Sequence, residues 1–180
     1  FPVMLNEVLK ISSPSNGGKF VDCTFGGGGY SRAILNFSNT TIQAIDRDKK
    51  VLSLAKELEK KFPKRFKFHQ SRFSQLDQTI SDYVDVVIFD LGLSSIQLND
   101  LKRGFSFKSS YDLDMAMGLN NISALDAVNK LNEKELKYII KFLGDEKDAS
   151  KIAKNIVKYR NVKRVTSTSE LVKIIEKSKK

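Results

Sequence analysis

The sequence predicts an α/β fold in which a parallel sheet, with helices between its strands, is followed by a segment that is helical throughout. Three observations predict it. Short apolar runs alternate with stretches of helical periodicity over the first half of the chain. Four consecutive glycines directly follow the first apolar run, as at a tight strand-to-helix connection. Beyond residue 120 the apolar residues recur at helical spacing. Alternating strands and helices are typical of a doubly wound parallel sheet.

Four strands are expected, at residues 20–24, 41–45, 66–69 and 84–91. The fourth run is almost continuously apolar, which is typical of a strand that is covered on both faces. Between the strands, apolar residues share one helical face at residues 30–37, 48–62 and 73–80. Asp48 is suited to cap the second of these helices, and Pro63 to end it.

Amphipathic helices are expected from Ser123 onward, the last of them from about Ser169. The connection at residues 92–121 carries scattered Gly, Ser and Asp, and a loop of that length in a compact domain is usually functional or disordered. The sequence therefore predicts two domains, a sheet domain at residues 1–119 and a helical domain at residues 120–180.

The charge of the chain is unevenly placed. Its 180 residues include 31 Lys and Arg against 21 Asp and Glu, a net charge of +10, of which +7 falls in residues 120–180. A concentrated basic surface is expected of a protein that binds a polyanion such as nucleic acid. A solvated, lysine-rich helical surface is the alternative.

Residue counts exclude several classes of protein. A single cysteine, Cys23, leaves no internal disulfide and no cysteine-based zinc site, and a single histidine, His69, leaves no multi-histidine metal site. No apolar run approaches the ~20 residues that a membrane helix needs. The chain opens without a signal-peptide pattern. We expect a cytoplasmic protein without a bound metal or a membrane segment.

The most informative motif is DCTFGGGGYS at residues 22–31, which ends a strand and opens a helix. Glycine permits a positive φ and lets the main chain approach a ligand closely. Asp46 ends the next strand, twenty residues after Gly26, where a carboxylate accepts the hydroxyls of a ribose. Together these features predict a site for a cofactor that contains a nucleoside. A tight turn without a ligand is the alternative.

Three cofactors compete for this site. A nucleotide P-loop needs Gly-Lys-Ser/Thr, but Tyr30 follows the glycines. The dinucleotide fingerprint lacks its third glycine, because Ser31 stands there. Sites for S-adenosylmethionine (AdoMet) place acidic residues before the glycines and after the second strand, as Asp22 and Asp46 do. They also place a polar loop after the fourth strand, where Asp90 lies. AdoMet is therefore the favoured cofactor.

Several strings together resemble one known family. They are FPVMLNEV at residues 1–8, the glycine motif at 22–31, AIDRD at 44–48, FDLGLSSIQL at 89–98, RGFSF at 103–107 and LDM at 113–115, with further matches at 124–129 and 166–171. With them the chain resembles the RsmH (MraW) family over nearly its whole length. The DLGLSSIQL and RGFSF strings are highly specific, whereas the glycine motif alone is not.

The resemblance implies a Rossmann-like, AdoMet-dependent methyltransferase that methylates N4 of a cytidine in the decoding region of 16S ribosomal RNA, with the small ribosomal subunit as partner. Residues 1–119 would then be the AdoMet-binding domain, and residues 120–180 a basic helical insert that contacts RNA. Asp90 is also expected to be catalytic, because it would position the target amino group or accept its proton. The cofactor-binding residues that the resemblance implies are Gly28, Gly29, Tyr30, Asp46, Phe73, Asp90 and Gln97.

The sequence departs from the family pattern at two motifs and in its length. Tyr30 stands where the family usually has histidine, and Ser-Tyr-Asp at residues 110–112 replaces Asp-Gly-Pro. The fourth strand would lie at the edge of the sheet despite its apolar character. We therefore expect residues 1–180 to hold strands one to four of a larger sheet, whose remaining strands follow Lys180.

Other functions remain open. One alternative is a methyltransferase that acts on another RNA, such as mitochondrial small-subunit rRNA, or on a small molecule or a protein. Another is a non-catalytic module that binds AdoMet or NAD. Methylation at C5 of cytosine would need a cysteine nucleophile, but Cys23 lies within the first strand, where a small buried side chain is typical. His69 is assigned no role.

Overall fold

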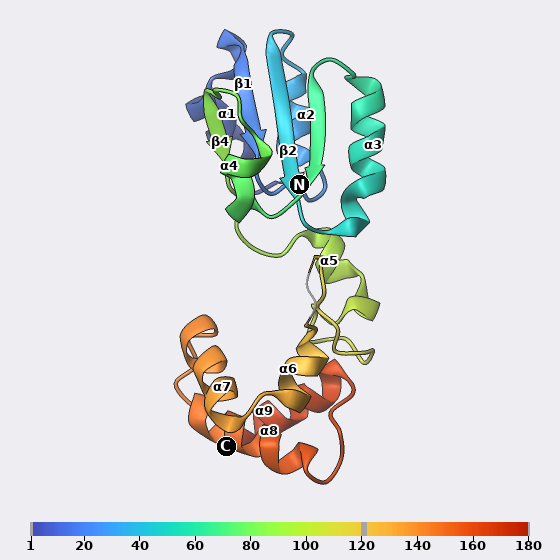
Figure 1. Ribbon diagram of the computed structural model, residues 1–180, viewed down its shortest axis with the longest axis vertical. Coiled ribbons are helices and arrows are strands. Elements are labelled where there is room, and N and C mark those ends of the chain that lie inside the picture. The colour runs from blue at the N-terminus through green and yellow to red at the C-terminus, as the bar shows by residue number, and fades with distance from the viewer. Residues whose placement is uncertain (1, 120–121, 180) are drawn as a thin grey trace. The chain divides into compact units, whose positions relative to one another are not determined.

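The α/β class is confirmed by the computed structural model, which describes residues 2–119 and 122–179 (Figure 1). The chain forms two compact units. One consists of Phe1–Ile96 with Met117–Leu119, and the other of Gln97–Ala116 with Asn120–Lys180. The second unit thus takes in residues 97–116, which the sequence pattern placed with the sheet.

The first unit contains a four-stranded parallel sheet. Its strands are β1 (Gly18–Asp22), β2 (Thr40–Asp46), β3 (Phe66–Gln70) and β4 (Val86–Ile88), in the order β3-β2-β1-β4. All four expected strands are confirmed, although β4 is shorter than its apolar run. Because β1 lies between β2 and β4, the residues that follow these three strands meet at one edge of the sheet.

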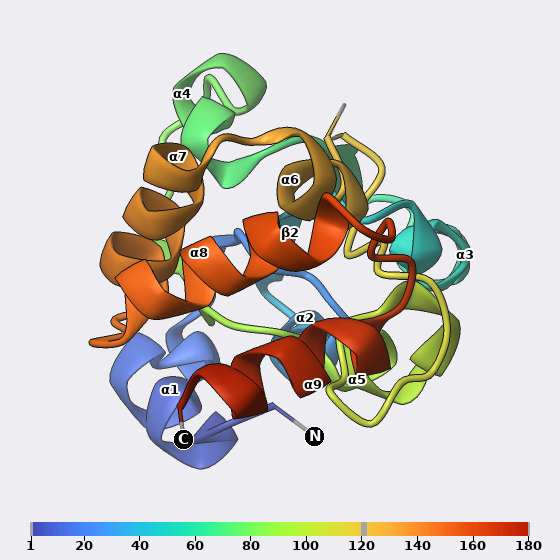
Figure 2. The same ribbon diagram turned by 90° about the horizontal axis from the view of Figure 1, so that it is seen from below.

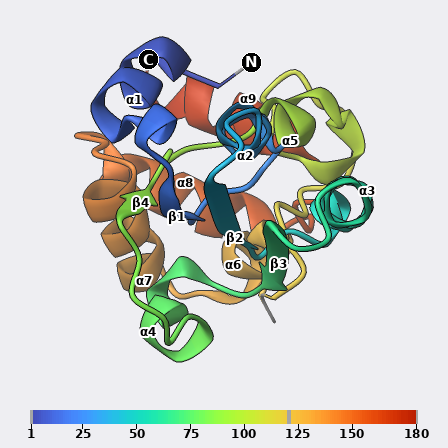
Figure 3. The ribbon, with the colours of Figure 1, turned by 90° about the horizontal axis from the view of Figure 1, so that it is seen from above.

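Helices lie on both sides of this sheet. Figure 3 shows α1 (Leu5–Ser12), α2 (Gly29–Leu35) and α3 (Leu52–Lys61) on one side and the short α4 (Leu76–Thr79) on the other. The larger core lies under α1, α2 and α3 and includes Phe20, Ile34, Ile42, Ala44, Leu58 and Phe66. The smaller core, beside α4, consists of Val21, Cys23, Ile45 and Ile80. Cys23 is thus a buried packing residue, as expected.

The expectation that residues 84–91 are covered on both faces is wrong for this structure. Val87 and Phe89 are 39% and 48% exposed, and Leu91 is 71% exposed. Within the described part of the chain, β4 pairs only with β1, and the small core beside α4 takes in Val84 but not Val87. Apolar side chains of this segment therefore remain exposed, because the described residues do not cover both of its faces.

The second unit is helical, as expected. Its helices are α6 (Ala124–Lys130), α7 (Glu133–Tyr138), α8 (Ala149–Arg160) and α9 (Thr168–Ser178), and α8 contacts the other three (Figure 2). A π-helical turn, η5 (Ile139–Leu143), extends α7 up to Gly144. The core of this unit includes Leu113, Val128, Leu136, Ile152, Ile156, Val165 and Ile174.

Shorter elements complete the chain. They are α5 (Ser95–Asn99), within which the two units divide, and the 3₁₀ turns η1 (Pro14–Asn16), η2 (Lys49–Val51), η3 (Phe73–Gln75) and η4 (Leu101–Arg103). Asp48 caps η2, because its carboxylate accepts the main-chain N–H of Lys50 at 3.0 Å. In the ranges 2–119 and 122–179, no helix is both long and apolar enough to cross a bilayer.

Much of the connection at residues 92–121 is an ordered part of the second unit. Leu113 is buried in its core, and the main-chain N–H of Leu113 donates to the carbonyl oxygen of Thr166 at 3.3 Å. Gly104 has a φ of 72°, and a Cβ there would lie 2.7 Å from the carbonyl oxygen of Asp112. The RGFSF string therefore needs its glycine for a close approach of two main-chain segments.

Capping boxes begin α6 and α7. The Ser123 hydroxyl accepts the N–H of Asp126 at 3.0 Å, and the Asp126 carboxylate accepts the N–H of Ser123 at 3.1 Å. Asn132 and Glu135 make the same reciprocal pair at α7. These side chains satisfy main-chain donors that the first turn of a helix leaves unpaired.

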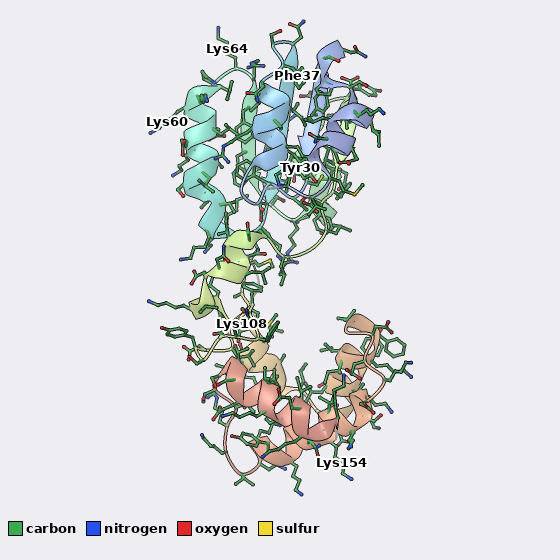
Figure 4. The ribbon with its side chains drawn as sticks, turned by 180° about the vertical axis from the view of Figure 1, so that it is seen from behind. Tyr30, Phe37, Lys60, Lys64, Lys108 and Lys154 are labelled. Atoms are coloured by element: carbon green, nitrogen blue, oxygen red, sulfur yellow. The ribbon has the colours of Figure 1, made fainter. Side chains whose placement is uncertain are left out.

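Arg65 stabilises the C-terminal end of α2. Its Nη1 donates to the carbonyl oxygens of Phe37 and Ser38 at 2.7 and 3.1 Å, and its Nη2 donates to that of Leu35 at 2.9 Å. We expect Arg65→Met to lower the free energy of unfolding by about 2 kcal/mol, because the variant cannot make these hydrogen bonds from a charged group. Urea denaturation followed by circular dichroism measures this. The control is Lys64→Met at the exposed neighbour (Figure 4), with an effect within ~0.5 kcal/mol. Equal effects of the two changes would contradict the prediction.

Candidate cofactor and active site

The candidate site lies at the carboxyl edge of the sheet, where β1, β2 and β4 end. Residues 24–28, the glycine loop, lead from β1 to α2 (Figure 1). Gly26 and Gly28 have φ values of 50° and 72°. These are left-handed conformations that favour glycine. The loop thus depends on backbone conformations that other residues adopt only with strain.

Asp46, at the end of β2, holds the glycine loop. Its Oδ2 accepts the main-chain N–H of Gly26 at 2.8 Å, and its Oδ1 accepts that of Asp48 at 2.9 Å. Burial raises the pKa of Asp46, although these main-chain donors act against the rise. A carboxylate has about four acceptor positions, so both oxygens retain capacity for further donors such as hydroxyl groups.

Asp22, at the end of β1, supports the loop from beneath. It is 1% exposed, and its carboxylate accepts the Ser31 hydroxyl at 2.7 Å and the main-chain N–H of Thr24 at 3.3 Å. Burial raises its pKa to about 6, and the nearby charge of Asp46 adds to the rise. Asp22 therefore braces the loop from within the protein.

The end of β4 is tied to the same loop. The main-chain N–H of Asp90 donates to the Thr24 hydroxyl at 2.8 Å. A Cβ on Gly26 would lie 3.6 Å from that of Ser94, so the segment after β4 lies against the glycine loop. The structure thus brings Asp90 and Asp46 to the two sides of one loop.

Tyr30 is buried rather than exposed at the site. Its ring belongs to the larger core, and its hydroxyl donates to the carbonyl oxygen of Val3 (Figure 4). Burial raises the pKa of Tyr30, and the carboxylates of Asp90 and Asp22 raise it further. A Cβ on Gly29 would lie 2.7 Å from the Pro2 ring. The N-terminal segment therefore packs against the start of α2, and Tyr30 anchors it there.

Two aromatic side chains meet just beyond the end of β4. The rings of Phe73 and Phe89 meet edge to face, with centroids 5.7 Å apart, and both remain nearly half exposed. The family resemblance pointed to Phe73, whereas Phe89 was not singled out because it was counted as part of a covered strand. The available signal was the position of Phe89, which stands immediately before Asp90 at the end of the strand.

The sequence pattern also did not reveal the roles of Thr24 and Asp48 at the loop. Gln97 is a residue of the second unit, where it is buried on α5, and its cofactor role stays a prediction. The Nε2 atom of His69 shares a hydrogen bond of 3.0 Å with Oε1 of Gln43 on the neighbouring strand. Over the described ranges, no three His, Cys, Asp or Glu side chains gather as metal ligands would.

The parallel sheet and the loop braced by carboxylates define an α/β protein of the class that binds ligands beyond the carboxyl ends of its strands. Residues 1–180 match the model of the MraW methylase family. The chain belongs to this family, which confirms the resemblance found in the sequence.

Several relatives are proteins named ribosomal RNA small subunit methyltransferase H. The chain is 43% identical over 178 residues to the protein of Rickettsia massiliae (strain Mtu5). This match covers 98% of the chain and 58% of the relative. The chain is 44% identical over 181 residues to that of Ehrlichia ruminantium (strain Welgevonden), with 97% and 60% covered. The chain thus spans 58–60% of the length of these curated relatives.

Asp22 should give the protein a specific pH dependence. Its pKa is raised from 3.8 to about 6, so its contribution to stability is fully present below about pH 4 and is lost as the pH rises through 6. Asp22→Asn does not titrate. The free energy of unfolding of the wild type minus that of the variant should therefore fall by on the order of 3 kcal/mol between pH 4 and 7. Urea denaturation at several pH values measures it, and a difference independent of pH would contradict the assignment.

Proposed function

We propose that the protein is an AdoMet-dependent methyltransferase that methylates N4 of a cytidine in the decoding region of 16S ribosomal RNA. The observation that carries the proposal is the glycine loop held between Asp46 and the Thr24–Asp90 contact. The names of the relatives support the RNA substrate, since each is called a small-subunit rRNA methyltransferase.

The residues present suit AdoMet. Asp46 retains acceptor capacity for the ribose hydroxyls, and the exposed Phe73 and Phe89 rings offer apolar surface to adenine. The family resemblance assigns Gly28 and Gly29 to the amino-acid part of the cofactor, and in this structure the Phe25 and Pro2 rings pack where a Cβ on Gly28 or Gly29 would lie. When bound, AdoMet supplies a methyl group on a positively charged sulfur. A nucleophile attacks the methyl carbon and displaces the sulfur.

Asp90 is the residue that would act on the target amine. The lone pair of cytosine N4 is delocalised into the ring, so the amine is a weak nucleophile. An exposed carboxylate at Asp90 can accept one N–H and hold the nitrogen in line with the methyl group, at about 3–3.5 Å. The methylated amine is cationic and sheds its proton readily, so positioning matters more than base strength. The target base must leave its stack to reach this edge.

Asp46→Ala should weaken AdoMet binding by about 1.5–3 kcal/mol, the scale of hydrogen bonds to a charged group. Calorimetric titration of the folded variant with AdoMet measures the dissociation constant. Asp82→Ala, at an exposed carboxylate that precedes β4 and so lies away from the carboxyl edge of the sheet, is the matched control and should bind like the wild type. An unchanged dissociation constant in Asp46→Ala would remove the ribose contact from the proposal.

The function itself is tested on RNA. Nucleosides from small-subunit rRNA of cells with and without the intact protein are compared by mass spectrometry. We expect one N4-methylated cytidine to disappear when the protein is absent and to return with the wild-type gene but not with Asp90→Ala. Unchanged rRNA, with methyl transfer to a protein or a small molecule instead, would favour the alternative substrate classes.

The basic surface of α8 is the proposed RNA contact. Lys151, Lys154 and Lys158 recur at helical spacing and are exposed (Figure 4 labels Lys154), and the described residues give none of them an acidic partner. Arg160, at the end of the same helix, instead donates to the carbonyl oxygen of Val128 at 2.8 Å. Three lysines on one helical face suit a row of phosphates.

Changing Lys151, Lys154 and Lys158 together to Gln should flatten the salt dependence of RNA binding. The slope of log affinity against log salt changes by roughly 0.7 for each phosphate that the variant no longer neutralises on single-stranded RNA, or about 2 for three. AdoMet affinity should not change. The matched control changes the exposed Lys56, Lys60 and Lys64 to Gln in the first unit, and its slope should equal that of the wild type. If both triple variants behaved alike, the α8 lysines would be a solvated surface.

A further inference from the structure

Thr24 connects the buried carboxylate of Asp22 to the main chain of the exposed Asp90. Its main-chain N–H donates to the buried Asp22 at 3.3 Å, and its hydroxyl oxygen accepts the main-chain N–H of Asp90 at 2.8 Å. Asp90 is exposed, whereas Thr24 is half-buried. The proposed function uses this contact as evidence for the site but gives the Thr24 hydroxyl no part in the methyl transfer.

This hydrogen bond replaces the sheet ladder at the point where the ladder stops. The N–H of Cys23 donates to the carbonyl oxygen of Ile88, the last residue of β4, at 2.9 Å. Two residues further along, the chain has left the strand, and the Thr24 hydroxyl holds its main chain. The Cα of Asp90, and with it the reach of the carboxylate, is therefore set by a side chain of the loop that follows β1.

We propose that Thr24 is a positioning residue for methyl transfer, and that its hydroxyl places Asp90 against the target amine. The inference rests on the proposed function, in which Asp90 touches the cytidine. In that step the N4–carbon bond forms as the carbon–sulfur bond breaks, sulfur keeps the electron pair, and the amine proton leaves to the Asp90 carboxylate or to water. A displacement of about 1 Å at such a group costs up to 10²-fold in rate.

Two substitutions separate the hydroxyl from the rest of Thr24. Thr24→Val has nearly the same shape and lacks the acceptor, whereas Thr24→Ser keeps the acceptor and removes only a methyl group. Neither change touches the main-chain bond to Asp22, so the anchor of the loop is preserved. Thr24→Ala also lacks the acceptor and serves if the valine variant does not fold, as judged by circular dichroism.

The test measures kcat and KM for small-subunit rRNA with the intact protein, together with AdoMet affinity by calorimetry. Thr24→Val should lower kcat by about 10-fold or more, with KM and the AdoMet dissociation constant within about 3-fold of the wild type. Thr24→Ser should restore most of kcat. An unchanged kcat in the folded valine variant, or a loss of AdoMet affinity as large as the loss of kcat, would overturn the inference.

Asp90→Asn in the same assay keeps this inference distinct from the proposed function. If Asp90→Asn retained full kcat, the assigned role of Asp90 would fail first. If Asp90→Asn were inactive while Thr24→Val turned over normally, only the positioning role would fail. Where Asp90→Asn leaves residual activity, adding Thr24→Val should lower it little further, because both changes remove one interaction. Additive losses would show that Thr24 acts elsewhere.

Discussion

The glycine loop has a fixed shape because two carboxylates hold its main chain. A run of four glycines has more conformational freedom than any other sequence, and ordering it costs the most entropy. Asp46 and Asp22 compensate by accepting main-chain donors at Gly26 and Thr24. Burying two like charges near each other is itself unfavourable, and burial raises the pKa of both groups. These two costs at one loop are what the proposed cofactor site would explain.

Sheet topology brings the rest of the site to this loop. The order β3-β2-β1-β4 puts β1 between its two functional neighbours, so Asp46 arrives from one side and Asp90 from the other. The loop contacts these two residues across 20 and 66 positions of sequence, respectively. A parallel arrangement is required, because only then do the three strands end at the same edge.

The parts of the structure that depend on local pattern could be predicted from the sequence. Apolar runs located all four strands, and the distance from the glycines to Asp46 located the second carboxylate. The features that could not be predicted depend on packing between distant segments. The exposure of Phe89 follows from what covers β4, and the inward ring of Tyr30 follows from the N-terminal segment packed over it. The role of the Thr24 hydroxyl could not be predicted, because its partner, the main-chain N–H of Asp90, lies 66 residues away in the sequence.

The central claim is that this loop and its carboxylates form an AdoMet site and not a dinucleotide site. Calorimetric titration of the purified chain with AdoMet and, separately, with NAD tests it most directly. We predict saturable binding of one AdoMet per chain and no measurable heat with NAD under the same conditions. Binding of NAD as tight as that of AdoMet, or no binding of AdoMet by a chain shown to be folded, would contradict the claim.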